Sequence, residues 1–147
     1  MPDHNYYMNL AKAVSDGSKC ERAKVGAVIV SPDGVIVSTG FNGQPKGMPN
    51  KCEENDTTLP TTLHAELNAI LNSIKTLKNA TIYVTHFPCN ECAKAIVQTG
   101  IKKVIFYSDK HKDLDSTKAS KIIFENAGVE IVNLKIHRDE IKIQFRD

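Results

Sequence analysis

The sequence predicts an α/β fold with three layers, in which helices cover both faces of a mixed central sheet of about five strands. An early pair of apolar segments, separated by a short polar turn, is typical of an antiparallel hairpin. After this hairpin, short apolar segments alternate with longer ones in which apolar residues recur at helical spacing. Such alternation favours parallel strands joined by helices that pack against the sheet.

The first expected elements are a helix and the hairpin. The helix should end near Asp16, because apolar residues before it recur at helical spacing: Tyr7, Leu10, Ala11 and Val14. Residues 24–30 and 35–40 are rich in valine and isoleucine and predict the two strands. The Ser-Pro-Asp-Gly sequence of residues 31–34 predicts the tight turn between them.

Residues 41–62 show no periodicity and contain glycine and proline among many polar residues. Loops of this length are uncommon inside a compact domain and are often functional, although a mobile surface insertion would give the same pattern. The next helix should begin near His64 and extend to the last of a series of apolar residues at helical spacing: Leu67, Ile70, Leu71, Ile74 and Leu77.

The second half of the chain alternates strands and helices. A helix should follow Pro88, which suits the first turn of a helix, and another, with apolar residues from Ala119 onward, should end at Gly128. Four segments are expected to be strands, the last of them at an edge of the sheet: residues 81–85, 103–107, 129–132 and 141–145.

Composition favours a single soluble domain over residues 1–147, with 41% hydrophobic and 24% charged residues. The formal charge of +2 gives no strong basic field, so a long nucleic acid is not an expected partner. No apolar run is long enough to span a membrane and the polar start is no signal peptide, so the cytoplasm is the expected location. In that reducing compartment, Cys20 and Cys52 are expected to remain free thiols.

His64, Cys89 and Cys92 form the strongest chemical pattern in the chain. One imidazole and two thiols suit Zn²⁺, and three protein ligands leave one tetrahedral position for a reacting water. Both parts of the pattern lie at expected helix N-termini, where the helix dipole favours thiolate. Glu66 can then carry protons, provided that the site lies across the helix end. The alternatives are a closed structural zinc site, or unrelated core cysteines and a surface histidine.

The order H-x-E followed by P-C-x-x-C is the signature of zinc-dependent nucleobase deaminases. It stands here as His64-Ala65-Glu66 and as residues 88–92, Pro-Cys-Asn-Glu-Cys. The chain resembles the deoxycytidylate (dCMP) deaminases of the cytidine deaminase superfamily, which implies their three-layer fold. The matching blocks cover most of the sequence: residues 20–28, 38–43, 64–70, 88–94 and 100–110.

This resemblance implies hydrolysis of dCMP to dUMP and ammonia, which supplies dUMP for thymidylate synthesis. A zinc-activated water would attack C4 of cytosine, and Glu66 would pass the water's proton first to N3 and then to the departing amine. The backbone N–H of Ala65 would hold the pyrimidine O2, and Asn42 would hydrogen-bond the sugar. Asn42 also precedes Gly43, so a simple turn is its other interpretation.

A nucleotide enzyme must hold a phosphate, and Arg22 is the first candidate because its planar guanidinium matches phosphate oxygens. Arg22 could instead belong to the solvated end of the first helix. Lys110 and His111 follow a strand at the open end of the sheet, where ligands bind in such folds. The family commonly has tyrosine where this chain has His111, although a histidine can still donate one hydrogen bond.

Regulation and assembly are implied by the resemblance alone. In the family, dCTP activates and dTTP inhibits, which could bring Mg²⁺ with the triphosphate, and the effector site includes the region of Gly43 and Glu53. The family usually forms hexamers, so a homo-oligomer is expected. Some phage members carry an extra structural zinc, for which Cys52 is not expected to serve because it has no neighbouring ligands in the sequence.

Two other interpretations stay open. The first is a zinc deaminase with a different substrate: dCTP, cytidine, a riboflavin-pathway pyrimidine or a tRNA adenosine. The modest net charge speaks against tRNA, which a basic face would bind. The second is a non-catalytic zinc module, which would have a fourth protein ligand and would give Glu66 no role.

Overall fold

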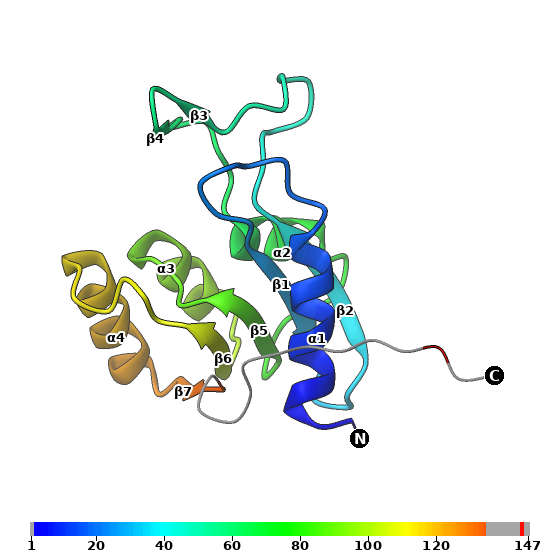
Figure 1. Cartoon of the computed structure of the whole chain (residues 1–147). Coiled ribbons are helices and arrows are strands. Elements are labelled where there is room, and N and C mark those ends of the chain that lie inside the picture. The colour runs from blue at the N-terminus through cyan, green and yellow to red at the C-terminus, as the bar shows by residue number, and fades with distance from the viewer. Residues whose placement is uncertain (1, 135–144, 146–147) are drawn as a thin grey trace.

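The computed structural model describes residues 2–134 and residue 145. Five strands form one sheet in the order β2-β1-β5-β6-β7 (Figure 1). β1 is antiparallel to both of its neighbours, whereas β5, β6 and β7 run parallel to one another. The mixed sheet predicted from the sequence is therefore confirmed. The strands are β1 (Gly26–Val30), β2 (Ile36–Phe41), β5 (Thr81–His86), β6 (Lys103–Ser108) and β7 (Glu130–Asn133).

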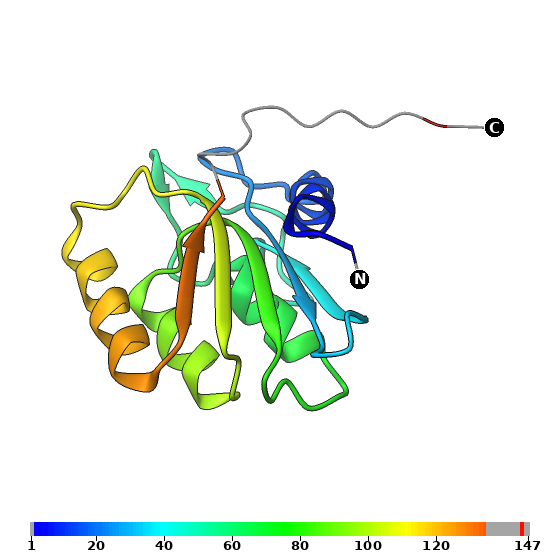
Figure 2. The same cartoon turned by 90° about the horizontal axis from the view of Figure 1, so that it is seen from below.

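Helices cover both faces of this sheet, which confirms the predicted three layers (Figure 2). α1 (His4–Ser15) packs against one face. α2 (Ala65–Asn72), α3 (Asn90–Gln98) and α4 (Asp115–Ala127) pack against the other. Within the described residues, no helix is long and apolar enough to cross a membrane.

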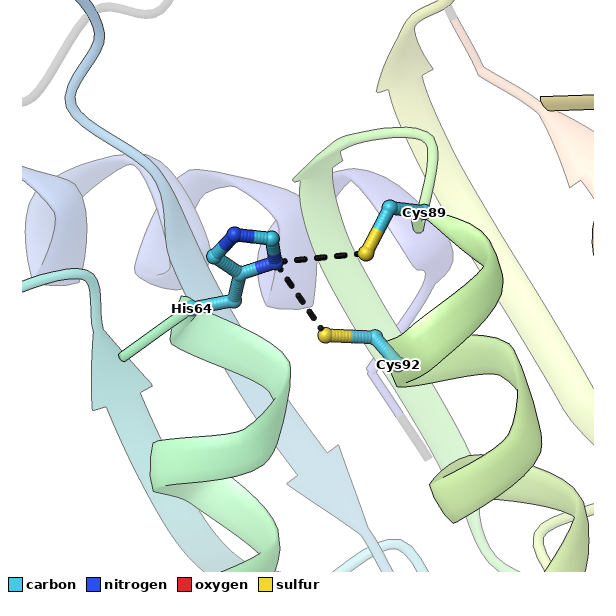
Figure 3. Close-up of side chains that lie close together, drawn as sticks. All are labelled: His64, Cys89 and Cys92. Carbon is cyan, nitrogen blue, oxygen red and sulfur yellow. Dashed lines mark hydrogen bonds between the residues drawn. The ribbon is translucent and has the colours of Figure 1, made fainter. Parts of the chain in front are cut away.

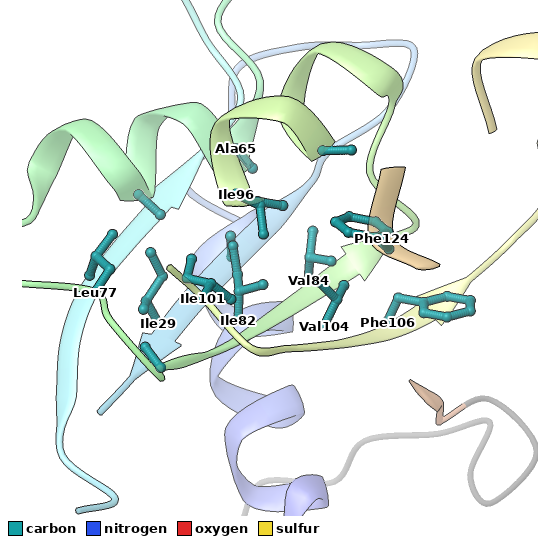
Figure 4. Packing of buried hydrophobic residues seen from close by; sticks show 14 residues of the cluster. Ile29, Ala65, Leu77, Ile82, Val84, Ile96, Ile101, Val104, Phe106 and Phe124 are labelled. Carbon is teal, nitrogen blue, oxygen red and sulfur yellow. The ribbon is translucent and has the colours of Figure 1, made fainter. Parts of the chain in front are cut away.

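The core lies in two apolar clusters, one on each side of the sheet. β1 is buried along its whole length, because helices cover both of its faces. Successive side chains alternate between the clusters: Val28 packs with Tyr7 of α1, whereas Ile29 joins the larger cluster under α2, α3 and α4 (Figure 4). This rigid centre carries the loops at the carboxyl ends of β5 and β6.

Two helix ends have clear local causes, and the sequence predicted the second of them. α1 begins after Asp3, whose carboxylate accepts a hydrogen bond of 3.0 Å from the N–H of Tyr6. α4 ends at Gly128, which adopts the left-handed conformation with φ of 73°. β7 follows directly, so the strand expected at residues 129–132 is confirmed. An edge strand was also expected at residues 141–145. Residues 141–144 of that range lie outside the described residues.

α2 is shorter than the sequence predicts, because it ends at Asn72 and does not reach Leu77. The Ser73 hydroxyl donates to the carbonyl of Lys75 and accepts from its N–H, so a local turn replaces the next helical turn. Ile74, which was expected on the apolar face, is 96% exposed. The prediction of a helix beyond residue 72 was wrong.

Two small residues of α2 allow a close approach to β2. Ala65 and Ala69 are fully buried opposite Gly40, where an added Cβ would lie 2.3 Å from the backbone nitrogen of Ala69. The side-chain amides of Asn68 and Asn72 donate to backbone carbonyls of β2 at 2.8 and 3.0 Å. This contact fixes the position of the α2 N-terminus, which carries His64.

The irregular segment 41–62 contains a small hairpin, β3 (Glu53–Glu54) paired with β4 (Thr57–Thr58). The two residues of its turn, Asn55 and Asp56, have positive φ values of 52° and 61°. Asparagine and aspartate tolerate this conformation better than most residues.

Cys20 and Cys52 are joined by a disulfide, so the prediction of two free thiols was wrong. The bond links the loop after α1 to the residue that precedes β3, and both cysteines are 2% exposed. Their separation of 32 positions conceals this proximity in the sequence. Cys89 and Cys92 remain free.

We predict that Gly40→Ala unfolds at a much lower urea concentration than the parent protein. A methyl group at this position would collide with backbone atoms of α2, an overpacking that costs about 3 kcal/mol or more. Gly43→Ala is the matched control, because nothing lies within 4 Å of an added Cβ there. Equal urea midpoints for the two variants would contradict this account of the α2 contact.

We also predict the number of thiols in the denatured, metal-chelated protein. Without reductant, only Cys89 and Cys92 should react with a thiol reagent, and reduction should raise the count to all four cysteines. Mass spectrometry of the alkylated peptides identifies the pair. Four reactive thiols before reduction, in protein purified without reductant, would show that the Cys20–Cys52 bond does not form.

Candidate active site

His64, Cys89 and Cys92 come together between two helix N-termini (Figure 3). The Nδ1 atom of His64 lies 3.3 Å from the sulfur of Cys89 and 3.5 Å from that of Cys92. His64 is the N-cap of α2, one position before the first turn in which the sequence placed it. Cys89 is the N-cap of α3, and Cys92 lies in the first turn of that helix.

Backbone N–H groups at these helix ends point at the sulfurs. The N–H of Cys92 donates to the sulfur of Cys89, and the N–H of Leu67 donates to that of Cys92. Neither N-cap side chain caps its own helix. The first N–H groups are therefore free to stabilise thiolates, as expected from the helix dipole.

The pKa values of the two cysteines shift in opposite directions. A hydrogen bond from the Cys92 thiol lowers the pKa of Cys89 to about 4, although burial opposes this shift. The same hydrogen bond, followed by burial, raises the pKa of Cys92 well above its usual range. The hydrogen bond to Cys89 also raises the pKa of His64. The site thus holds a thiolate beside an imidazole, which suits a cation such as Zn²⁺.

Glu66 is buried in the first turn of α2, with 4% of its surface exposed. Burial raises its pKa to about 7, although its own backbone N–H and the charge of His64 act in the opposite direction. The side chain of Cys92 also lowers the pKa of Glu66, which places the carboxyl group next to the ligand group. A carboxyl group with a near-neutral pKa can both accept and return a proton near pH 7.

The ligand set fits zinc better than a hard cation, because two of its three members are sulfur. A second group of potential ligands consists of Cys20, Cys52 and Glu53, whose ligand atoms lie within 4.8 Å of one another. The expectation that Cys52 has no neighbouring ligands was therefore wrong. In this structure, the two sulfurs of that group are bonded to each other.

A cavity of about 310 Å³ opens over the ligand group. Its size is in the range of small-molecule sites. It brings together nearly all of the site residues predicted from the sequence, from six separate segments: Arg22, Asn42, Glu53, His64, Ala65, Glu66, Cys89, Lys110 and His111. Gly43 and Cys92 are not among the lining residues. Gly43 instead exchanges two backbone hydrogen bonds with Leu63, of 3.0 and 2.7 Å.

Arg22 lies on a wall that is built from two loops. Its Nη1 atom is 3.5 Å from the hydroxyl of Thr58 in β4. The Glu53 carboxylate accepts hydrogen bonds from the N–H groups of Glu21 and Arg22, at 3.1 to 3.3 Å. Glu53 therefore holds the loop that presents Arg22.

Asn42 reaches the cavity but also fastens the segment beside it. Its Oδ1 atom accepts from the N–H of Val25 at 2.9 Å, and its Nδ2 atom donates to the carbonyl of Ala23 at 2.8 Å. Each end of the amide retains one more hydrogen-bonding position for a ligand. Among the described residues, the N–H of Ala65 makes no hydrogen bond and is available to a ligand.

Sequence reasoning missed the part of the cavity wall formed by His86, Thr58 and Thr62. His86 is the last residue of β5 and comes three positions before Cys89. Its place at the carboxyl end of a parallel strand was the signal that pointed to a ligand site. Thr58 and Thr62 belong to the irregular segment, where no periodicity indicates which side chains point inward.

Comparison with known sequences shows a family match over the part of the chain that contains these residues. Residues 1–108 match the family described as the cytidine and deoxycytidylate deaminase zinc-binding region. Human deoxycytidylate deaminase is 45% identical over 133 residues, which cover 84% of this chain and 75% of the human protein. The mouse deoxycytidylate deaminase is 42% identical and covers 95% of this chain and 84% of its own length.

Solved structures agree with these relatives. The dCMP deaminase from the cyanophage S-TIM5, in complex with dCMP and dUMP, matches with a TM-score of 0.79 and 36% identity over 88% of this chain and 94% of its own. RibD from Acinetobacter baumannii matches with a TM-score of 0.63 and 29% identity over 87% of this chain, but only 34% of RibD is covered. Because the family match spans most of the chain and includes the His64, Cys89 and Cys92 cluster, the chain belongs to the zinc-binding cytidine and deoxycytidylate deaminase family.

Proposed function

We propose that this chain, as one deaminase domain over residues 1–147, hydrolyses dCMP to dUMP and ammonia. One observation carries the proposal: the buried carboxyl group of Glu66 lies beside the His64, Cys89 and Cys92 cluster, under a cavity with basic side chains on its walls. The names of the human, mouse and cyanophage relatives support dCMP as the substrate.

His64, Cys89 and Cys92 would hold Zn²⁺. Zinc bound there supplies a Lewis acid that makes a coordinated water more acidic. Glu66 takes one proton from the attacking water and delivers it to N3 of cytosine. It then takes the second proton from the hydroxyl group on C4 and delivers it to the amine, which leaves as ammonia when the C4–N bond breaks and the C4 carbonyl forms. The near-neutral pKa that burial gives Glu66 suits both directions of transfer. The Ala65 N–H donates to the pyrimidine O2, which orients the ring.

The remaining contacts of the nucleotide fall to the cavity walls. Asn42 uses its second hydrogen-bonding position for the sugar. Arg22, Lys110 and His111 supply donors for the phosphate, and their presence in one cavity supports this assignment. The solvated-helix interpretation of Arg22 does not account for its place in the cavity wall.

We also propose that dCTP activates the enzyme and that dTTP inhibits it, with Mg²⁺ bound to the triphosphate. We further propose that the chain assembles into a homo-oligomer such as a hexamer. Two contacts could transmit an effector signal. Gly43 is paired with Leu63, the residue before His64, and Glu53 holds the backbone of Arg22. An effector that moves residues 43–53 would therefore act on both the metal ligand and the substrate arginine.

We predict that the zinc-loaded protein deaminates dCMP at least roughly a hundredfold faster than dCTP, cytidine or a tRNA stem-loop, compared as kcat/KM. The cationic donors on the cavity walls favour dCMP over the uncharged cytidine, and the cavity volume of about 310 Å³ favours a monophosphate over a triphosphate or a stem-loop. Ammonia release measures all four substrates, with and without added dCTP and dTTP. Turnover of cytidine and the stem-loop alone would reject dCMP as the substrate.

We predict that Glu66→Gln lowers kcat by roughly a thousandfold or more, because an amide cannot accept the proton of the attacking water. Zinc content should remain near that of the parent protein, since the three ligands are unchanged. Glu91→Gln is the matched control, because Glu91 lies between the two cysteines with its side chain 75% exposed and paired with Lys94. A Glu66→Gln enzyme with parental turnover would point to a non-catalytic zinc module.

A further inference from the structure

His86, Lys110 and His111 form a distinct cationic part of the cavity. The pKa of His86 is lowered first by burial and then by the charges of Lys110 and His111. The pKa of His64, in contrast, responds to Cys89 and Glu66. The cavity therefore has an anionic part that attracts a metal ion and a cationic part that attracts an anion.

The sheet places these basic residues next to one another. His86 ends β5 and is the register partner of Ser108, which ends the neighbouring parallel strand β6. The N–H of Phe87 donates to the carbonyl of Ser108 at 2.9 Å, so the two strands stay paired to the edge of the sheet. Lys110 and His111 begin the loop that follows β6 and is exposed to solvent.

The imidazole of His86 has one end fixed and the other available. Its Nδ1 atom lies 3.0 Å from the hydroxyl oxygen of Thr85, which accepts a hydrogen bond of 3.1 Å from the N–H of Gly26. The Thr85 hydroxyl satisfies both neighbours if it donates its own proton to Nδ1. The neutral ring then carries its proton on Nε2, which is a hydrogen-bond donor for the cavity.

The side chains of His86, Lys110 and His111 offer hydrogen-bond donors to the cavity. In residues 2–134 and 145, the ion pairs involve Lys12, Lys94 and Lys103, and Lys110 is in none of them. Two imidazoles and an ammonium group that face one cavity match the several oxygens of a phosphate monoester.

We propose that His86 is a phosphate-binding residue, whose Nε2–H donates to the 5′-phosphate of the nucleotide beside Lys110 and His111. The inference rests on the proposed function and deepens it, because it names the residue that makes the enzyme prefer a nucleotide to a nucleoside. The imidazole of His86 is held by Thr85 and is therefore pre-oriented, whereas Lys110 and His111 are exposed to solvent.

The test is the ratio of kcat/KM for dCMP to kcat/KM for deoxycytidine, which lacks the phosphate. His86→Leu should lower this ratio about tenfold or more, mainly through a higher KM for dCMP, because a hydrogen bond to a charged group is lost. His86→Gln should retain most of the ratio, since its amide nitrogen reaches close to the position of Nε2. The shorter amide of His86→Asn lies near the position of Nδ1, so this variant should lower the ratio as much as His86→Leu does.

Binding measured without turnover separates this inference from the proposed function. Calorimetry on the zinc-loaded protein should show that His86→Leu weakens the binding of dUMP about tenfold relative to the binding of deoxyuridine. If the parent protein does not deaminate dCMP, the proposed function fails, whereas the calorimetric ratio still decides the role of His86. An unchanged ratio in both experiments, or an equal loss for both ligands, would overturn the assignment. Circular dichroism and zinc content identify a variant that has not folded.

Discussion

The site depends on one geometric constraint, which is that the N-termini of α2 and α3 lie side by side on the same face of the sheet. His64 and Cys89 are 25 residues apart in the chain, so only this arrangement brings their side chains together. β5 leads directly into α3 through Phe87 and Pro88, whereas α2 is held by its close contact with Gly40. A ligand set that exists only in the folded chain couples metal binding to folding.

Burial acts on the two ends of the cavity in a related way. It raises the pKa of Glu66 and lowers the pKa of His86, and in both cases it favours the neutral form. The neutral carboxylic acid of Glu66, beside the candidate metal ligands, can donate a proton. The neutral imidazole of His86, beside Lys110 and His111, can donate a hydrogen bond of fixed direction. The same low-polarity surroundings therefore prepare one residue for chemistry and another for recognition.

The wall that carries Arg22 is held together by contacts between segments that are distant in the sequence. The Cys20–Cys52 disulfide, the hydrogen bonds from Glu53 and the Arg22–Thr58 contact all join the loop after α1 to the β3–β4 hairpin. Segment 41–62, which lacks any periodic pattern, thus becomes part of the cavity. A mobile surface insertion would not supply lining residues, so the functional interpretation of this loop gains support.

Local spacing was enough to predict the alternation of strands and helices, the candidate ligands at two helix N-termini and Glu66 as the carboxylate beside them. The end of α2 at Asn72 is also local, because Ser73 exchanges hydrogen bonds with Lys75, but the spacing of apolar residues does not reveal it. Other features depend on packing: Ala65 and Ala69 of α2 are buried because they fit against Gly40. The Cys20–Cys52 bond and the position of His86 beside Lys110 arise only when the sheet brings separate loops to one edge. Chain distance carries no information about such contacts, since they are set by strand order and packing.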